Sequence, residues 1–271
     1  MRRSRTPGRI LQIMVAVFLY APILVLIVFS FNSDKSRTQF KGFTLDWYVS
    51  LFQNQTVLSA LYLTLILAVL SAVIATIIGT VSAIGLYNMK QRPRKILLAL
   101  NNIPVVNPDI ITGVSLMLVF VTVLRLLGSK AGLGFPTLLI AHVTFNIPFV
   151  ILSVLPKLRQ LSKHTYEAAL DLGASPFTAY RRVILPEIMP GVVSGAMIAF
   201  TMSIDDFLIS YFTTGTSVQT LPMVIYGMTR KRISPEINAL STLLFVTILI
   251  LLIAINVLQS RDQKRKERRL P

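Results

Sequence analysis

Six long apolar runs constrain the fold of this chain more than any other feature of its sequence. They cover residues 10–31, 57–86, 96–124, 135–155, 188–212 and 237–259. About 20 apolar residues in helical conformation span the hydrocarbon core of a bilayer, where only helices and closed barrels satisfy every backbone hydrogen bond. The 54% share of apolar residues is also too high for a soluble domain of 271 residues. The sequence therefore predicts an all-α, polytopic membrane protein with six transmembrane helices.

The first run follows Arg2, Arg3, Arg5 and Arg9, a layout that signal peptides share. It is too long for the apolar region of a signal peptide, and no small-x-small cleavage site follows it. We therefore expect residues 10–31 to be retained as the first transmembrane helix.

The distribution of Lys and Arg predicts the orientation of the chain. With the N-terminus inside, segments 1–9, 87–95, 156–187 and 260–271 carry 4, 4, 5 and 6 Lys and Arg, whereas the outer segments 32–56, 125–134 and 213–236 carry 3, 2 and 3. By the positive-inside rule both termini are expected in the cytoplasm. The basic tail 260–271 then lies near anionic lipid, so the net charge of +16 does not indicate nucleic acid as a partner.

Several kinds of chemistry have no residues to support them. The sequence has no Cys, no G-x-x-x-x-G-K-[ST] phosphate loop and no H-E-x-x-H metal motif, and its two histidines, His142 and His164, are isolated. We therefore expect no cofactor or metal in this chain and no enzymatic activity. Energy for transport would have to come from another subunit.

A polar and amphipathic block, residues 163–186, separates the fourth and fifth apolar runs. Ser162 can cap a first helix, and Gly173 suits the position just past its end, where a positive φ is needed. Ser175, followed by proline, can start a second helix that Pro186 ends. A helix hairpin at the membrane interface is one interpretation. The other is a docking surface for a soluble partner, because crossing the bilayer needs no such block.

Three acids, Asp109, Asp205 and Asp206, fall well inside the apolar runs. At helical rise Asp109 lies about 20 Å from the cytoplasmic end of its span, and the Asp pair about 21–23 Å from theirs. Intramembrane carboxylates are costly and usually face a polar pathway or a partner. Adjacent helical residues point about 100° apart, so one of the pair can line the pathway while the other bonds to a neighbouring helix.

Carboxylates at matched depth indicate a cationic substrate, such as a flexible diamine or triamine held at its ends. Phe207, Tyr211 or Trp47 can assist through cation–π contacts. The structural alternative is a hydrogen-bond network, or for Asp109 the N-cap of a helix restarted after Pro108.

The block at 163–186 resembles the EAA loop of ABC importer permeases, a motif of Glu-Ala-Ala, three residues, Gly, nine residues and Ile-x-Leu-Pro. The matching positions are Glu167, Ala168, Ala169, Gly173 and Pro186, and Val183 departs mildly from the usual Ile. In that family the loop docks into a groove of the ATPase subunit. Segments 42–52, 107–110, 142–150, 201–207 and 234–240 extend the resemblance to the PotC-type permeases of spermidine/putrescine importers.

The resemblance implies a type I ABC importer transmembrane domain over residues 57–255, with coupling loop 163–186 and the first transmembrane helix outside that core. It implies a bacterial cytoplasmic (inner) membrane complex with two ATP-binding-cassette subunits, a second homologous permease and an extracytoplasmic polyamine-binding protein. ATP and Mg would be bound by the ATPase subunits, and Asp109, Asp205 and Asp206 would serve the substrate pathway.

Two alternatives stay open at this point. The chain could be an ABC permease for another solute, such as ferric iron, an opine or an aminophosphonate, or a channel or secondary transporter that works alone. Arg230, Lys231 and Arg232 on the predicted outer side would repel a polycation, or would meet acids on the binding protein.

Overall fold

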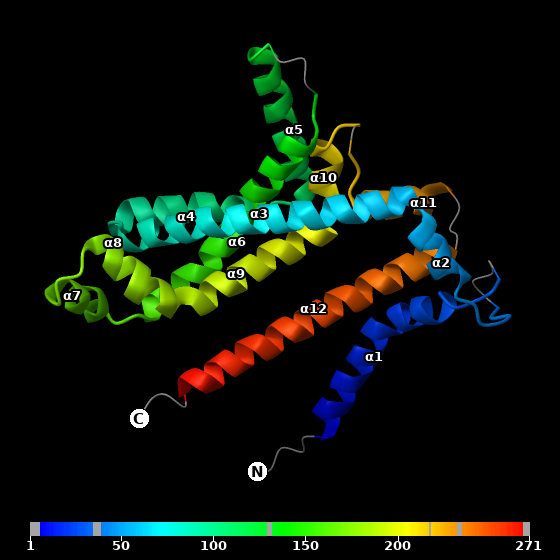
Figure 1. The fold of residues 1–271 in the computed structure, drawn as a ribbon, viewed down its shortest axis with the longest axis horizontal. Coiled ribbons are helices and arrows are strands. Elements are labelled where there is room, and N and C mark those ends of the chain that lie inside the picture. Colours follow the sequence, from blue (N-terminus) through cyan, green and yellow to red (C-terminus); the bar gives the residue numbers. More distant parts are fainter. Residues whose placement is uncertain (1–5, 35–38, 129–131, 217, 232–234, 268–271) are drawn as a thin grey trace. The chain divides into compact units, whose positions relative to one another are not determined.

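The computed structural model describes residues 6–34, 39–128, 132–216, 218–231 and 235–267. Over this part the chain is helical, apart from one isolated bridge between Asn32 and Phe43. Figure 1 shows the helices in chain order: α1 (Thr6–Phe29), α2 (Asp46–Gln53), α3 (Gln55–Asn88), α4 (Gln91–Val106), α5 (Asp109–Leu126), α6 (Phe135–Gln160), α7 (Lys163–Asp171), α8 (Pro176–Ala179), the π-helix η1 (Tyr180–Ile184), α9 (Leu185–Asp205), α10 (Leu208–Thr213), α11 (Leu221–Lys231) and α12 (Pro235–Glu267). The all-α prediction is confirmed.

The apolar helices match the predicted membrane spans in number but not in every boundary. Five described helices are long and apolar enough to cross a membrane, namely Leu11–Phe29, Gln55–Asn88, Asp109–Leu126, Phe135–Gln160 and Pro176–Asp205, and Pro235–Ile250 is a shorter apolar helix. The sixth predicted span, 237–259, falls within α12, where most side chains beyond residue 250 lie outside the described residues.

Two predicted spans are broken helices. The third, expected over 96–124, divides into α4 and α5 because Pro108 lacks an N–H and disfavours helix at Asn107, whose ψ of 141° is extended. The fifth, expected over 188–212, divides into α9 and α10 at Asp206, whose ψ is 124°. Neither Pro nor Gly marks this second break, so no local signal in the sequence predicts it.

The chain forms two compact units, Ser59–Val224 and a second unit made of Met1–Leu58 with Ile225–Pro271. In the first unit, α6 packs against α3 and α9 around a shared apolar core. A Cβ on Gly79 of α3 would lie 2.7 Å from the Val150 Cβ, and one on Gly195 of α9 would lie 3.1 Å from the Val150 Cα. Small residues therefore let both helices approach α6 closely.

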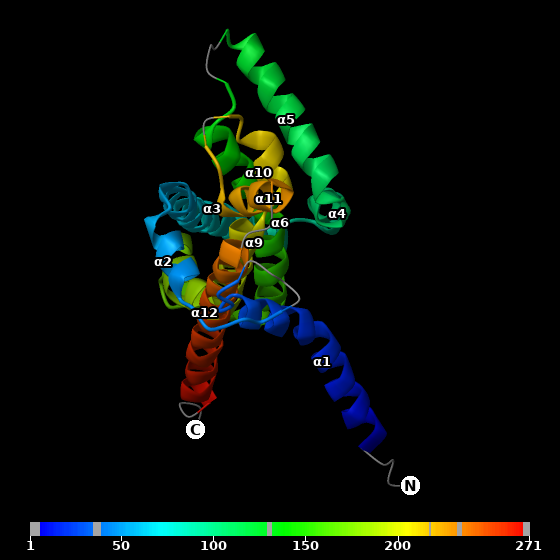
Figure 2. The same cartoon turned by 90° about the vertical axis from the view of Figure 1, so that its right-hand side faces the viewer.

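Helix α5 leaves the direction shared by the other long helices of this unit. Figures 1 and 2 both show α5 turned away from α3, α6 and α9. Its main contact is with the short helix α10, where a Cβ on Gly113 would meet Phe212 at 3.1 Å. The two helix breaks thereby face each other.

In the other unit, α1 and α2 each pack against α12. Ser50 Oγ donates to Glu236 Oε1 at 2.9 Å, and the Trp47 indole N–H donates to the Asn32 carbonyl at 2.8 Å. Trp47 is therefore held by the backbone of its own unit.

Candidate functional site

The three intramembrane acids lie at the two helix breaks. Asp109 is the first residue of α5, Asp205 is the last residue of α9, and Asp206 follows it. Asp109 lies within electrostatic range of both Asp205 and Asp206. The contact between α5 and α10 thus brings Asp109 together with two carboxyl groups that lie nearly 100 residues later in the sequence.

Asp206 caps the helix that follows it. Its Oδ2 accepts a hydrogen bond from the Ser210 backbone N–H at 2.7 Å, and its Oδ1 accepts one from the Ile209 N–H at 3.2 Å. Only 6% of this side chain is exposed, and its Oδ2 lies 3.5 Å from His142 Nε2. Helix N-termini favour such carboxylates because their first N–H groups lack partners and carry partial positive charge. Asp206 is thus the member of the pair that bonds to a neighbouring helix.

His142 is a packed, hydrogen-bonded residue, as its isolation in the sequence indicated. It is 1% exposed, and its Nε2 lies 3.0 Å from Ser210 Oγ. His142, Asp206 and Ser210 therefore join α6 to the start of α10.

Asp109 and Asp205 are exposed. The expectation that Asp109 could be the N-cap of a restarted helix is wrong, because Pro108 occupies that position and no side chain caps α5. Neither carboxylate has a Lys or Arg ion-pair partner among the residues that the structure describes. A carboxylate in an apolar span is unfavourable unless water or a cation reaches it, so these two groups are available to a cationic solute.

Aromatic rings stand beside the acids on α10. The Phe207 and Tyr211 ring centroids lie 5.4 Å apart, and Tyr211 meets Phe212 edge-on at the same distance. Tyr211 is 53% exposed. Such ring faces can contact an ammonium group.

A buried polar network that the sequence analysis missed joins three helices next to the acids. Ser203 Oγ lies 2.9 Å from Ser71 Oγ and accepts from Asn146 Nδ2 at 2.8 Å. Ser203 is two residues before Asp205 on α9, Ser71 is on α3 and Asn146 on α6. These three polar residues lie within otherwise apolar runs, which is the sequence feature that could have indicated the network.

The block at 163–186, named the coupling block from here on, has the predicted caps. Ser162 Oγ accepts from the His164 N–H at 3.4 Å, and Ser175 Oγ accepts from the Thr178 N–H at 3.3 Å. Gly173 has a φ of +84°, which explains glycine at this turn.

The expected end of the second helix at Pro186 is wrong. The chain continues from α8 through the π-helix η1 directly into α9, so that residues Pro176–Asp205 form one continuous helix. Pro186 lies in the first turn of α9. The wider π turn just before it accommodates a residue that has no N–H to donate.

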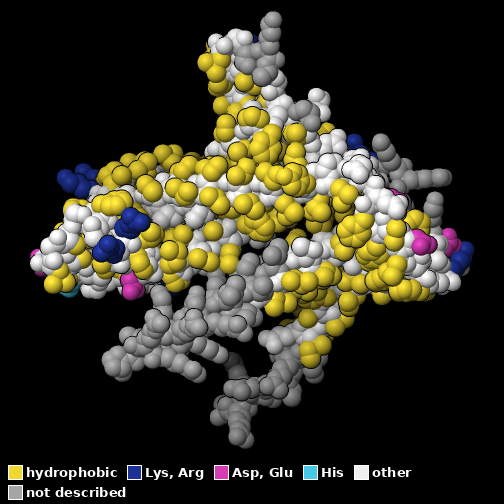
Figure 3. Space-filling model, in the orientation of Figure 1, with side chains coloured by type: hydrophobic (Ala, Val, Ile, Leu, Met, Phe, Trp, Pro, Cys, Tyr) yellow, Lys and Arg dark blue, Asp and Glu magenta, His cyan; other side chains and the backbone are white. Residues whose placement is uncertain are grey.

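The coupling block exposes apolar side chains between charged ones. Leu172 is 89% exposed and Phe177 is 73% exposed. Glu167 lies 3.2 Å from His164, and both side chains are largely exposed. Figure 3 shows Lys, Arg and acidic side chains gathered at this end, beside apolar side chains on the flanks of the long helices. Exposed large apolar groups among charges are typical of a protein-docking surface.

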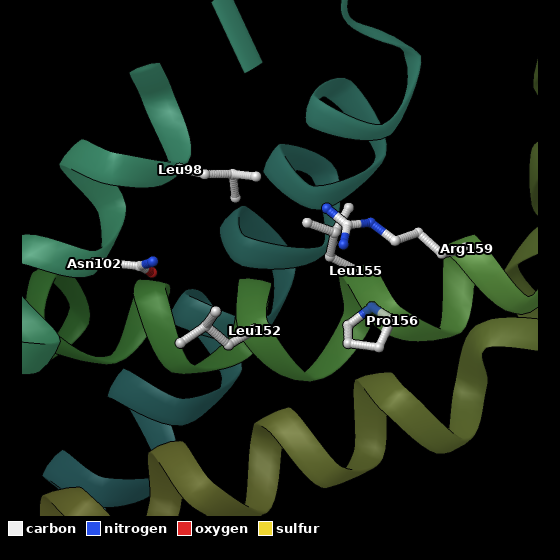
Figure 4. A pocket seen from close by; sticks show the side chains of 6 residues that line it. All are labelled: Leu98, Asn102, Leu152, Leu155, Pro156 and Arg159. Atoms are coloured by element: carbon white, nitrogen blue, oxygen red, sulfur yellow. The ribbon is translucent and has the colours of Figure 1, made fainter. Parts of the chain in front are cut away.

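A shallow groove of about 200 Å³ lies between α4 and α6, away from the acids. Figure 4 shows its lining by Leu98, Asn102, Leu152, Leu155, Pro156 and Arg159. It contains no carboxylate, so it offers nothing to bind a cation.

Comparisons with known proteins identify the family of the chain. The chain is 41% identical over 262 residues to the "Spermidine/putrescine transport system permease protein PotC" of Escherichia coli (strain K12), covering 95% of this chain and 97% of that one. It is 38% identical over 266 residues to the "Putrescine transport system permease protein PotI" of the same strain, covering 97% and 95%.

The fold resembles a solved bacterial ABC transporter involved in the import of the acidic polysaccharide alginate, with a TM-score of 0.75, 17% identity and 94% of each chain covered. At that identity the likeness shows the fold alone, that of type I ABC transporter permeases. Residues 75–269 match the family described as "Binding-protein-dependent transport system inner membrane component". The chain, a multi-pass membrane protein, therefore belongs to this family of binding-protein-dependent transport permeases.

Proposed function

We propose that this chain is a permease subunit of an ATP-driven polyamine importer, with spermidine or putrescine as its solute. The observation that carries the proposal is the pair of exposed carboxylates, Asp109 and Asp205, which lie within electrostatic range of each other at the two helix breaks. The names of the PotC and PotI relatives support the same solute class.

Asp109 and Asp205 have a direct role in the pathway, and Asp206 has an indirect one. Asp109 and Asp205 accept hydrogen bonds from protonated amines, and the Tyr211 face provides a cation–π contact between them. Asp206 serves the pathway indirectly, since its two backbone hydrogen bonds fix the break that presents Asp205. Two separated anionic points suit a linear polycation better than a compact ion.

Coupling to ATP hydrolysis occurs at the coupling block. Two ATP-binding-cassette subunits bind ATP and Mg²⁺ and dock on Glu167, Ala168, Ala169 and the turn at Gly173, with Pro186 at the start of α9. Leu172 and Phe177 supply exposed apolar contacts for the groove of the ATPase. The chain itself carries out no catalysis.

A second, homologous permease completes the pathway, and an extracytoplasmic binding protein delivers the solute. The coupling block and both termini face the cytoplasm, in the inner membrane of a bacterium, as the excess of Lys and Arg on that side supports. Arg230 lies with its guanidinium 5.1 Å from the Tyr226 ring centroid, a cation–π contact that orients its side chain.

The test is uptake of labelled putrescine and spermidine in cells with and without the gene, in a strain that has no other polyamine importer. Asp109→Asn and Asp205→Asn are compared at equal membrane abundance. Loss of uptake on deletion and on each neutralisation supports the proposal. Uptake that survives deletion overturns the solute assignment and directs attention to ferric iron, opines or aminophosphonates. Uptake that survives both neutralisations overturns the role of the acids.

A further inference from the structure

The coupling block is attached to the membrane helices at a further point besides its chain connections to α6 and α9. The Tyr180 hydroxyl, at the start of η1, accepts a hydrogen bond from Asn88 Nδ2 at 2.7 Å. Asn88 is the last residue of α3, 92 residues earlier in the chain. A side-chain hydrogen bond therefore links the block to a helix with which it has no close connection along the chain.

The Asn88 amide is oriented by its own helix. Its Nδ2 also donates to the Ile84 carbonyl at 3.0 Å, one of the last carbonyls of α3, which have no N–H partner within the helix. An amide nitrogen carries two hydrogens, so one is directed to α3 and the other to Tyr180. The Asn88 side chain is thus oriented toward Tyr180 by its own helix.

The Tyr180 ring is fixed as well. It packs on the Tyr166 ring of α7, with the centroids 5.0 Å apart, and both rings lie against the core shared by α3, α6 and α9. Tyr180 therefore contacts α7 through its ring and α3 through its hydroxyl, while its backbone leads through η1 into α9.

At the middle of α3 and near the C-terminal end of α9, these two helices are joined again. Ser71 Oγ of α3 lies 2.9 Å from Ser203 Oγ of α9, next to the acids. Between the two links, α6 is held closely by Gly79 on one side and Gly195 on the other. A displacement of α9 that left α3 behind would break one link or the other.

We infer that Tyr180 and Asn88 are positioning residues. The hydrogen bond between their side chains, called the strut from here on, makes α3 move together with α9 when the ATPase displaces the coupling block. The strut stays closed throughout the transport cycle. The inference rests on the proposed function, because it takes the coupling block as the point where the ATPase acts.

The first test is Tyr180→Phe, which removes only the hydroxyl. In membrane vesicles containing the complete importer, spermidine uptake and ATP hydrolysis are measured in the same sample. Uptake per ATP hydrolysed is expected to fall about two- to tenfold, the range that one hydrogen bond supports. Complex abundance stays unchanged, because the bond is solvent-exposed. The matched control is Tyr87→Phe, the same change beside Asn88, at a hydroxyl with no recorded hydrogen bond within the described chain.

The second test is the double variant Tyr180→Phe/Asn88→Ala. Because both changes remove one contact, its loss should be no greater than that of the more affected single variant. Additive losses would overturn the inference, as would an equal loss in Tyr87→Phe.

The third test uses the absence of Cys from the sequence. In Asn88→Cys/Tyr180→Cys, a short bismaleimide replaces the lost hydrogen bond with a covalent link. Uptake per ATP should recover on cross-linking. Abolished uptake would mean that the contact has to open during the cycle, and the strut would be refuted.

Failure of the proposed function and failure of the strut give different results. Wild-type vesicles that take up no polyamine contradict the proposed function. Wild-type uptake that Glu167→Ala uncouples and Tyr180→Phe leaves intact contradicts the strut alone.

Discussion

Replacement of Asp206 by Ala should weaken the fold rather than only the transport pathway. The variant leaves the N–H groups of Ile209 and Ser210 without the carboxylate that they contact at 3.2 and 2.7 Å. Loss of an N-cap side chain costs about 0.5–2 kcal/mol, and hydrogen bonds to a charged group contribute about 1.5–3 kcal/mol. Relief from burying a carboxylate that is 6% exposed offsets part of this. We expect a net loss of about 2 kcal/mol, the upper end of the cap range.

The measurement is thermal melting of the detergent-purified importer, followed by the fraction that remains monodisperse. For a chain of this size the loss corresponds to a decrease in Tm of roughly 4–8 °C. Asp206→Asn keeps one acceptor oxygen and should recover about half of the decrease, since Asn is itself a good cap. Asp205→Asn is the matched control one residue away and should melt like the wild type. An Asp206→Ala variant that melts with the wild type, yet loses uptake, would refute the capping role and make Asp206 a direct solute ligand.

Three further substitutions test other parts of the structure. Gly173 has a φ of +84° and open space around it, so Gly173→Ala should cost about 1–2 kcal/mol of backbone strain and lower uptake. Gly173→Asn should be tolerated, and equal uptake in the two variants would contradict the need for a left-handed residue at this turn. Gly191→Ala places a Cβ 2.9 Å from a backbone oxygen of α6 and should lower the stability by about 1–3 kcal/mol. Its control is Gly85→Ala, where the added Cβ meets nothing within 4 Å, so the Tm should be equal or higher. Ser203→Ala leaves Asn146 Nδ2 without its buried partner and should cost about 1–3 kcal/mol; an unchanged Tm would show that the network adds nothing to stability.

The parts of the fold that local chemistry determines could be predicted from the sequence. The apolar runs predicted the membrane spans, because a single segment in lipid satisfies all its backbone hydrogen bonds only as a helix. Ser162, Ser175 and Gly173 gave the caps and the turn of the coupling block, because capping depends on a few neighbouring residues.

Features that depend on contacts across the fold could not be predicted. The break at Asp206 has no Pro or Gly and exists because α10 uses the carboxylate as its cap. The continuation through Pro186 requires a π turn, which no sequence period indicates. Asn88 gave no signal either, since its partner Tyr180 lies 92 residues away. For the acids, the depth along the helices was estimated well enough to group them, but which of them are exposed depended on the tertiary arrangement.

The helix from Pro176 to Asp205 is unbroken over 30 residues, so a tilt at one of its ends displaces the other. It is about 45 Å long at the usual rise per residue, so a tilt of about 5° at the ATPase end displaces the acid end by about 4 Å. A charge-assisted hydrogen bond spans only about 2.7–2.9 Å. If Asp205 binds the solute as proposed, a rotation that small would carry it out of reach of a bound ammonium group without a local rearrangement at the acids.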